Sequence, residues 1–429
     1  MTTLVVLVFV IAYILIATEW VHRVAAALIG AAAMVVLGQA DGHTAFFSEN
    51  TGVDWNVIFL LLGMMIIVSI VKQTGAFEYL AIWSAKRARG RPFAVMSMLV
   101  VITAVASALL DNVTTVLLVA PVTLLVCDRL AAPPVPFLIA EAMASNIGGT
   151  ATLIGDPPNI IIASRSGLVF NDFLVNLAPV VIVLVAVFVL MCRVLFRDAL
   201  RYDPERAADV MSLDEREMIR DPALLWKCGG ILVLVLGAFV AHSAIEVEPS
   251  MIALLGAGAL VGVSRTEPSD YLQDVEWATL VFFMGLFVMV GGLVNAGVIE
   301  SVGHWLIDSV GHRYALAGSV LLWGSAALSG IVDNIPYVAT LSPLVHDLVA
   351  AGGGGGQARS LWWALALGAD LGGNATAVGA SANVVVLGIA ARNGHPISFW
   401  TFTKYGLVVA PVTIAIAWGY YLLRYFVLA

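Results

Sequence analysis

The chain has 429 residues, of which 61% are hydrophobic and only 12% are charged. Soluble domains hold roughly 45 to 50% apolar and about 25% charged residues, so this composition excludes an ordinary soluble enzyme or binding domain. The formal net charge of -8 is spread among the connecting segments and identifies no partner. Apolar runs recur along the whole length, and a helix needs about 20 apolar residues to cross a bilayer. The sequence therefore predicts one integral membrane domain.

In chain order, the first half contains three plain apolar runs, two runs interrupted by polar residues, and a final span. They lie at 4–17, 24–38, 56–72, 94–127, 136–163 and 171–196. The run at 94–127 is too short for two full crossings and has Arg at both ends, so we expect a re-entrant hairpin. Pro157 and Pro158 lack backbone donors, so we expect the run at 136–163 to be a broken helix.

The second half repeats the first. Asp54-Trp55 returns 222 positions later as Glu276-Trp277, and Asp111-Asn112 returns at the same offset as Asp333-Asn334. The Gly-Gly segment 146–155 returns at 370–379, 224 positions later. The matching runs lie at 228–244, 250–264, 276–297, a hairpin at 314–350, a broken helix at 361–390, and 402–427. Three blocks in one order at nearly one offset indicate an internal repeat.

Five crossings and one hairpin per half is an odd number, so the second half must enter the membrane the other way up, as in secondary transporters. We expect an all-α polytopic membrane protein with ten transmembrane helices, two re-entrant hairpins and two broken helices. Residues 1–200 and 228–429 form the inverted repeats, joined by a linker at 201–227. Lys and Arg cluster at 72–91 and 193–227, including Arg206, which predicts that these segments are cytoplasmic. Both termini are then expected outside the inner (cytoplasmic) membrane.

Ionisable side chains inside spans cost about 2.5 to 3.5 kcal/mol on insertion scales, so they are functional candidates. Besides Glu141, which lies near the start of its run within reach of cytoplasmic water, they are aspartates at the hairpins and breaks. Amides and hydroxyls accompany them, each of which alone could be a helix cap or packing contact. As a symmetric set they predict an ion or substrate site. The set is Asp111, Asn112, Thr114, Asn146, Thr150, Thr152, Asp156, Asn159, Asp333, Asn334, Asp370, Asn374, Thr376 and Asn383.

Other classes of function lack their motifs. The sequence contains no phosphate-binding G-x-x-x-x-G-K-[ST] loop, no Cys or His cluster for a metal, and no nucleophile triad, so we expect neither an enzyme, a cofactor nor a nucleic-acid partner. No Lys or Arg is expected at mid-membrane depth, so an anion would rely on helix N-termini. Tryptophans near the run ends are expected at the membrane interfaces. They are Trp226, Trp277, Trp362, Trp363 and Trp400.

The motifs Asp111-Asn-Val-Thr-Thr115 and Ser145-Asn-Ile-Gly-Gly-Thr-Ala-Thr-Leu-Ile-Gly-Asp-Pro-Pro-Asn159 closely resemble the signature of the ArsB/NhaD permeases in the ion transporter superfamily. The likeness covers nearly the whole chain and is strongest to the branch similar to the melanosomal P-protein. More distantly, the hairpin tips are similar to the Ser-Asn-Thr motifs of divalent-anion/sodium symporters. That resemblance implies a homodimer with an elevator-like transport domain.

The resemblance also implies roles for single residues. In NhaD-type sodium/proton antiporters the matching positions belong to the ion path, which here means Asp111, Asn112, Asn146 and Asp156 and implies a possible sodium site. The match departs after Asp156, where Pro157-Pro158 stand in place of hydroxyl residues, as in members resembling the P-protein and the arsenite permeases.

The leading interpretation is a proton-coupled efflux permease for arsenite, antimonite or another small inorganic ion. Asp111 and Asp156 would alternate between protonated and ion-engaged states while the hairpins and broken helices move together. The alternatives are sodium/proton antiport by the same residues, an anion channel, and dicarboxylate/sodium symport. The expected partners are lipid, the transported ion, a second copy of the chain and possible docking of a cytosolic ATPase on the 197–227 loop, with H⁺ or Na⁺ as coupling ion.

Overall fold

The computed structural model describes residues 2–428 except 19, 49, 202–207, 209–210, 212–213 and 303–312. The described residues form helices and contain no β-strand. Seven of these helices are long and apolar enough to cross a membrane, and further apolar helices are shorter. The expectation of an all-helical membrane protein is therefore confirmed. Most of the expected linker at 201–227, including Arg206, lies outside the described residues or in short 3₁₀ turns.

The helices of the first half begin and end close to the predicted runs. They are α1 (Thr2–Thr18), α2 (Arg23–Val36), α3 (Gly42–Phe46), α4 (Trp55–Gln73), α5 (Ala76–Arg87), α6 (Pro92–Leu109), α7 (Asn112–Leu130), α8 (Pro134–Gly149), α9 (Pro157–Ser166) and α10 (Phe170–Leu195). The starts are set locally, because proline at the first helical position has no donor to lose and its φ already suits a helix. This is the case for Pro92, Pro134 and Pro157.

The helices of the second half follow in the same order. They are α12 (Pro222–Ile245), α13 (Pro249–Ser264), α14 (Pro268–Leu272), α15 (Trp277–Asn295), α17 (Tyr314–Ser329), α18 (Asn334–Ala351), α19 (Gly356–Gly372), α20 (Ser381–Arg392) and α21 (Phe399–Leu422), with a last π-helical turn at Leu423–Val427. Helices α4 and α15 both contain 19 residues and start at positions 222 apart. Even the short α3 has a counterpart in α14.

The two halves exchange equivalent contacts. Helix α4 packs on α13 of the other half, and α15 packs on α2. A Cβ added to Gly63 of α4 would lie 2.8 Å from the Cβ of Ala253, and one added to Gly285 of α15 would lie 3.1 Å from the Cβ of Ala27. Reciprocal contacts of this kind are what a two-fold relation between the halves produces. Each half therefore completes its helix packing with helices of the other.

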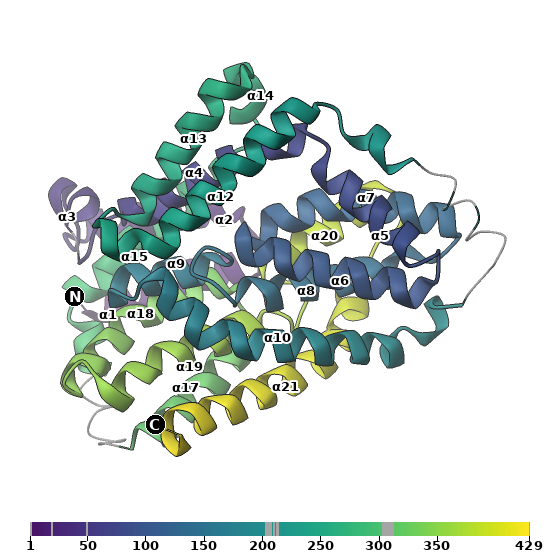
Figure 1. The fold of residues 1–429 in the computed structure, drawn as a ribbon. Coiled ribbons are helices and arrows are strands. Elements are labelled where there is room, and N and C mark those ends of the chain that lie inside the picture. The colour runs from purple at the N-terminus through teal and green to yellow at the C-terminus, as the bar shows by residue number, and fades with distance from the viewer. Residues whose placement is uncertain are drawn as a thin grey trace.

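The two hairpins enter from opposite ends of the molecule. Figure 1 shows α6, α7 and α8 toward one end, with α17, α18 and α19 toward the other. After each break the chain continues to the far side, so α9 packs beside α18 and α20 packs beside α7. The hairpin tips consequently meet the breaks of both halves in the middle of the molecule.

The helices divide into two groups. The core bundle consists of α6–α9 and α17–α20, the hairpins and broken helices, which pack on one another. The outer bundle consists of α1, α2, α4, α12, α13 and α15. Helices α10 and α21 lie along the core bundle and pack against each other (Figure 1). This division places the polar segments in one bundle and mostly plain apolar helices in the other.

Three sequence-based expectations are wrong. Trp362 and Trp363 are not interfacial but only 2% and 3% exposed, because α19 is enclosed by other helices of the core bundle and by α10 and α21. Glu141 does not reach water, since it is 1% exposed between α7 and α8 and accepts a hydrogen bond from the Thr123 hydroxyl. The chain also forms helix α5 where no element was expected, and its weakly apolar sequence explains the miss.

Close helix packing in the core bundle depends on two equivalent glycines. A Cβ on Gly148 would overlap the backbone of Ala104, and one on Gly372 would lie 2.6 Å from the Cα of Ala326. We expect G148A and G372A each to destabilise the protein by about 1 to 3 kcal/mol through overpacking. The measurement is the thermal unfolding midpoint in detergent.

The matched control is G258A on α13, where an added Cβ meets nothing within 4 Å. This variant should keep or raise the midpoint, because alanine is the better helix former by about 1 kcal/mol. Equal midpoints for G148A and G258A would contradict the packing argument.

Candidate functional site

The hairpin tips are built by helix caps. Asp111 is the N-cap of α7 and accepts hydrogen bonds from the Thr114 backbone N–H at 2.8 Å and from the Thr114 hydroxyl. Asp333 is the N-cap of α18 and accepts from the Ile335 N–H at 3.0 Å. Both carboxylates thus satisfy donors at the start of their own helix. The next residue of each helix, an asparagine, is left to face the centre.

The Asp156 carboxylate does not cap its own helix. It occupies the N-cap position of α9, but its side chain makes no cap hydrogen bond. Pro157 and Pro158 have no N–H to donate, and the third N–H of the helix, that of Asn159, bonds to the Asp156 backbone carbonyl at 3.0 Å. The carboxylate turns instead to the hairpins. It accepts from Asn112 Nδ2 at 2.9 Å and from Asn334 Nδ2 at 3.3 Å, so it joins both hairpin tips.

The non-helical turns at the two breaks are held by equivalent hydrogen bonds. Asn159 Nδ2 donates to the Thr152 carbonyl at 3.0 Å, and Asn383 Nδ2 donates to the Thr376 carbonyl at 2.9 Å. The hydroxyls of the same threonines donate to carbonyls at the ends of α6 and α17, at 2.5 Å and 2.6 Å. Backbone that leaves the helix inside a membrane needs such partners. These four residues therefore hold the breaks open.

A chain of amides crosses from one half to the other. Asn112 Nδ2 also lies 3.1 Å from Asn146 Oδ1, and Asn146 Nδ2 donates to Asn374 Oδ1 at 2.9 Å and to Asn383 Oδ1 at 3.0 Å. Thr150 supports it by donating its hydroxyl to the Asn146 carbonyl. Asn146 is thus the residue through which the first hairpin, the first break and the second break are connected.

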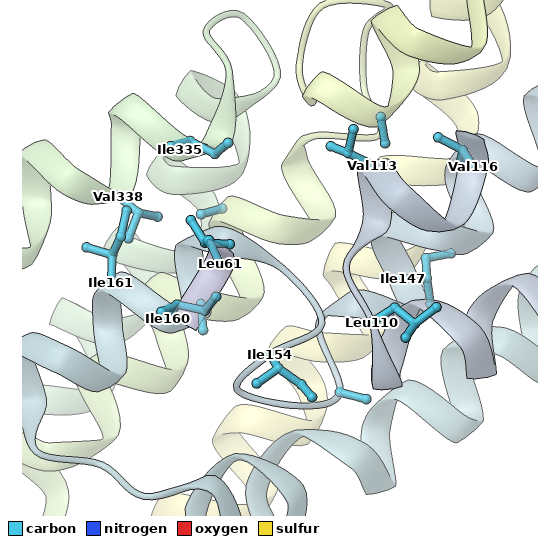
Figure 2. Packing of buried hydrophobic residues seen from close by; sticks show 14 of the residues in the cluster. Leu61, Leu110, Val113, Val116, Ile147, Ile154, Ile160, Ile161, Ile335 and Val338 are labelled. Carbon is cyan, nitrogen blue, oxygen red and sulfur yellow. The ribbon is translucent and has the colours of Figure 1, made fainter. Parts of the chain in front are cut away.

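Several oxygens at this centre have no donor. Asp370 is fully buried, and neither of its carboxylate oxygens makes a hydrogen bond, although Thr150 and Asn159 approach it. The side-chain oxygens of Asn112 and Asn159 are also buried without a partner. Asp156 is also fully buried, and Asp370 lies close enough to it for the two carboxylates to repel each other. Hydrophobic side chains from both halves, among them those labelled in Figure 2, surround the break between α8 and α9.

The centre therefore offers acceptors to a positively charged species. Two neighbouring buried carboxylates repel each other and lose their hydration, so both can be ionised only with a cation between or beside them. No ion pair joins Asp156 or Asp370 to Lys or Arg in the part of the chain that the structure describes. Each acid must take up a proton or accept a metal cation. Oxygen ligands of this kind suit H⁺ and hard cations such as Na⁺.

The predicted site residues do not all serve the centre. The described residues contain no group of three or more His, Cys, Asp or Glu side chains that could hold a metal ion. Within the sodium set implied by the resemblance, Asn112, Asn146 and Asp156 are linked by hydrogen bonds, whereas Asp111 is occupied by its own helix.

One basic residue was missed. Arg23, at the start of α2, lies with Nη1 3.7 Å from Asp333 Oδ2, although it was not among the predicted site residues. The signal in the sequence was a lone arginine directly before an apolar run. That signal does not reveal a contact with Asp333, because the packing of α2 against the second half is not visible along the chain.

Buried polar breaks inside an all-helical membrane bundle, lined by paired acids and amides, define a membrane transporter. Residues 13–368 match CitMHS, the citrate transporter family, and the chain belongs to this family. Uncharacterized transporter Mb2703 of Mycobacterium bovis is 58% identical over 429 residues, which is 100% of both chains. The human P protein is 34% identical over 494 residues, with 97% of this chain and 59% of the P protein covered.

A solved structure has the same fold. The YdaH transporter of Alcanivorax borkumensis, described as having an unusual topology, superposes with a TM-score of 0.60. It covers 91% of this chain and 87% of its own at 14% sequence identity. The identity to the human P protein confirms the resemblance to that branch, while membership of the ArsB/NhaD branch stays a prediction.

The amide chain predicts a specific stability effect. In N146A the side-chain oxygens of Asn374 and Asn383 lose the donor that satisfies them. A buried acceptor without a partner costs about 1 to 3 kcal/mol, so N146A should lower the thermal unfolding midpoint in detergent by several degrees. The control is N393A, which removes an amide at an exposed helix end and should leave the midpoint nearly unchanged. Equal midpoints for N146A and N393A would show that the hydrogen-bonded amides contribute little to the stability of the protein.

Proposed function

We propose that this protein is a secondary active transporter whose coupling ion, H⁺ or Na⁺, is taken up by Asp156 and Asp370. The observation that carries the proposal is the pair of buried acids, of which Asp156 is bound only by neutral amides and Asp370 accepts no hydrogen bond at all. Two buried acids are stable only when a positive ion from outside neutralises them. The uptake and release of that ion, H⁺ or Na⁺, is the step that an ion gradient can drive.

The geometry supports alternating access by movement of the core bundle. Asp156 is bonded to both hairpin tips, so a change of charge on it alters the contacts of both hairpins at once. The hairpins approach from opposite ends (Figure 1), and the outer bundle packs on the core bundle through α4 on α7 and α9 and through α15 on α18. We infer an elevator-like movement in which the core bundle shifts as a unit relative to the outer bundle.

For the cargo, we propose efflux of a small inorganic ion, with arsenite and antimonite as first candidates. The support is the resemblance of the 145–159 segment to the permeases of that class. Arsenite is also compatible with the centre, because it is largely a neutral hydroxide at neutral pH and can donate hydrogen bonds to bare acceptors. Sodium/proton antiport by the same acids is the variant in which Na⁺ itself is the cargo.

A second candidate is a citrate-like anion, favoured by the family to which the chain belongs. Free citrate would place carboxylates against Asp156, Asp370 and amide oxygens that have no donor, which is repulsive. A citrate–metal complex removes this repulsion, because the metal ion presents positive charge to the acids. This candidate therefore requires a divalent cation together with the anion.

The test uses proteoliposomes with an internal pH dye. Arsenite, Na⁺, citrate, and citrate with Mg²⁺ are added in turn to separate samples. We expect proton movement with the true cargo and none with the others. Currents far above carrier turnover would contradict coupled transport and support a channel.

Neutralising either acid should abolish coupling. We expect D156N and D370N each to reduce ion-coupled transport by about 100-fold or more, because the amide cannot exchange a proton and no longer attracts a cation. The matched control is D347N, an exposed carboxylate at the end of α18, which should transport as the parent does. Full ion-coupled transport in both D156N and D370N would contradict the proposed site.

A further inference from the structure

Arg23 reaches from the outer bundle into the core bundle. It starts α2, and its Nη1 donates to Ser381 Oγ, the first residue of α20, at 2.7 Å. Ser381 Oγ in turn donates to Asp333 Oδ2 at 2.6 Å, and the same Arg23 nitrogen lies 3.7 Å from that oxygen. One guanidinium is thus bound to the start of α20 and to the tip of the second hairpin.

The other side of the guanidinium is held by the outer bundle. Arg23 Nη2 lies 3.5 Å from Thr279 Oγ1 on α15, and the Arg23 Cζ lies 5.6 Å from the centre of the Phe282 ring. Thr279 donates onward to Glu276 Oε2 at 2.9 Å. A guanidinium placed over an aromatic face and beside a hydroxyl has a fixed orientation. Arg23 therefore behaves as part of α2 and α15 and not as a loose surface chain.

The size of the cavity beside Arg23 distinguishes a cargo-binding role from a role in joining the two bundles. A cation next to a helix N-terminus could bind an anionic cargo, but the adjoining cavity, lined by Phe282, Asp333 and Val378, measures about 20 Å³. This holds one water molecule and no larger ligand. The arrangement fits a closed contact between two bundles better than a cargo site.

We propose that Arg23 is a positioning residue, a clasp that fixes the second hairpin and α20 against α2 and α15. Movement of the core bundle relative to the outer bundle has to break this contact. The clasp thereby restrains opening and sets how often the hairpin moves. This inference rests on the proposed alternating access, since a clasp has a role only if the bundles move.

The clasp can be tested without measuring transport. Val378 lines the cavity beside Arg23, so in V378C the rate of alkylation by a maleimide reports how often the contact opens. The native Cys127, Cys192 and Cys228 are buried and give little background. We expect R23Q to raise the alkylation rate of V378C by roughly tenfold, the factor for losing one charge-assisted contact. R23K keeps the charge but loses the planar fork, so its rate should fall between those of the parent and R23Q.

The matched control is K72Q. Lys72 Nζ pairs with Asp274 Oδ1 at 3.0 Å, so K72Q also removes one partly exposed ion pair. Both residues belong to the outer bundle and its connections, so this pair does not join the two bundles. K72Q should leave the alkylation rate unchanged. Equal rates in R23Q, K72Q and the parent would overturn the clasp, as would a similar rise in R23Q and K72Q.

A transport measurement separates this inference from the proposed function. In proteoliposomes, R23Q should raise cargo-free proton leak several-fold, whereas K72Q should not. If alkylation responds to R23Q but no variant transports any ion tested, the proposed function fails and the clasp stands. If coupled transport is present and neither alkylation nor leak responds to R23Q, the clasp fails and the proposed function stands.

Discussion

The structure depends on burying two carboxylates that have no Lys or Arg partner among the described residues. Asp156 and Asp370 lie at the breaks of the first and second half; Asp156 accepts the amide N–H groups of Asn112 and Asn334, whereas neither oxygen of Asp370 accepts a hydrogen bond. Such a centre is unfavourable by itself, since charged groups without counter-charge are expensive to bury. It becomes favourable when H⁺ or a metal cation is present. The surrounding fold makes that dependence possible by holding the acids in place.

The breaks are what bring the acids there, and they are made by ordinary local chemistry. Pro157 and Pro158 begin α9 without backbone donors, the Asn159 N–H bonds to the Asp156 carbonyl, and the Asp156 carboxylate makes no cap hydrogen bond. Asn159 and Asn383 satisfy the carbonyls that the interrupted helices leave bare. The contacts of Asn159 and Asn383 occur in the same way in both halves, whereas Ser381 and Ala382 stand where the first half has the two prolines. The acids at the two breaks do not correspond either, and this difference gives the site its character.

Much of the architecture could be predicted, because repeats, hairpins and breaks leave marks along the chain. The glycines and polar residues at 146–155 and 370–379 repeat at a nearly constant offset whatever the surroundings. The hydrogen-bond partner that each polar side chain takes could not be predicted. Asp111 and Asp370 both look like membrane carboxylates, yet the first is used by its own helix and the second has no donor. The position of Arg23 depends on how α2 packs against the other half, which spacing along one chain does not encode.

Equivalence between the halves stops at the acids of the two breaks, Asp156 and Asp370. The position equivalent to Asp156 is Ala380, and the position equivalent to Asp370 is Asn146. In the alternating access proposed above, two identical halves would make the inward-open and outward-open forms equivalent by a two-fold rotation and equal in intrinsic free energy. Because Asp156 and Asp370 have no acidic counterparts, the two forms of the proposed carrier differ in free energy even without a gradient. These four side chains would then set how long each form lasts, while the gradients of cargo and coupling ion set the net direction of transport.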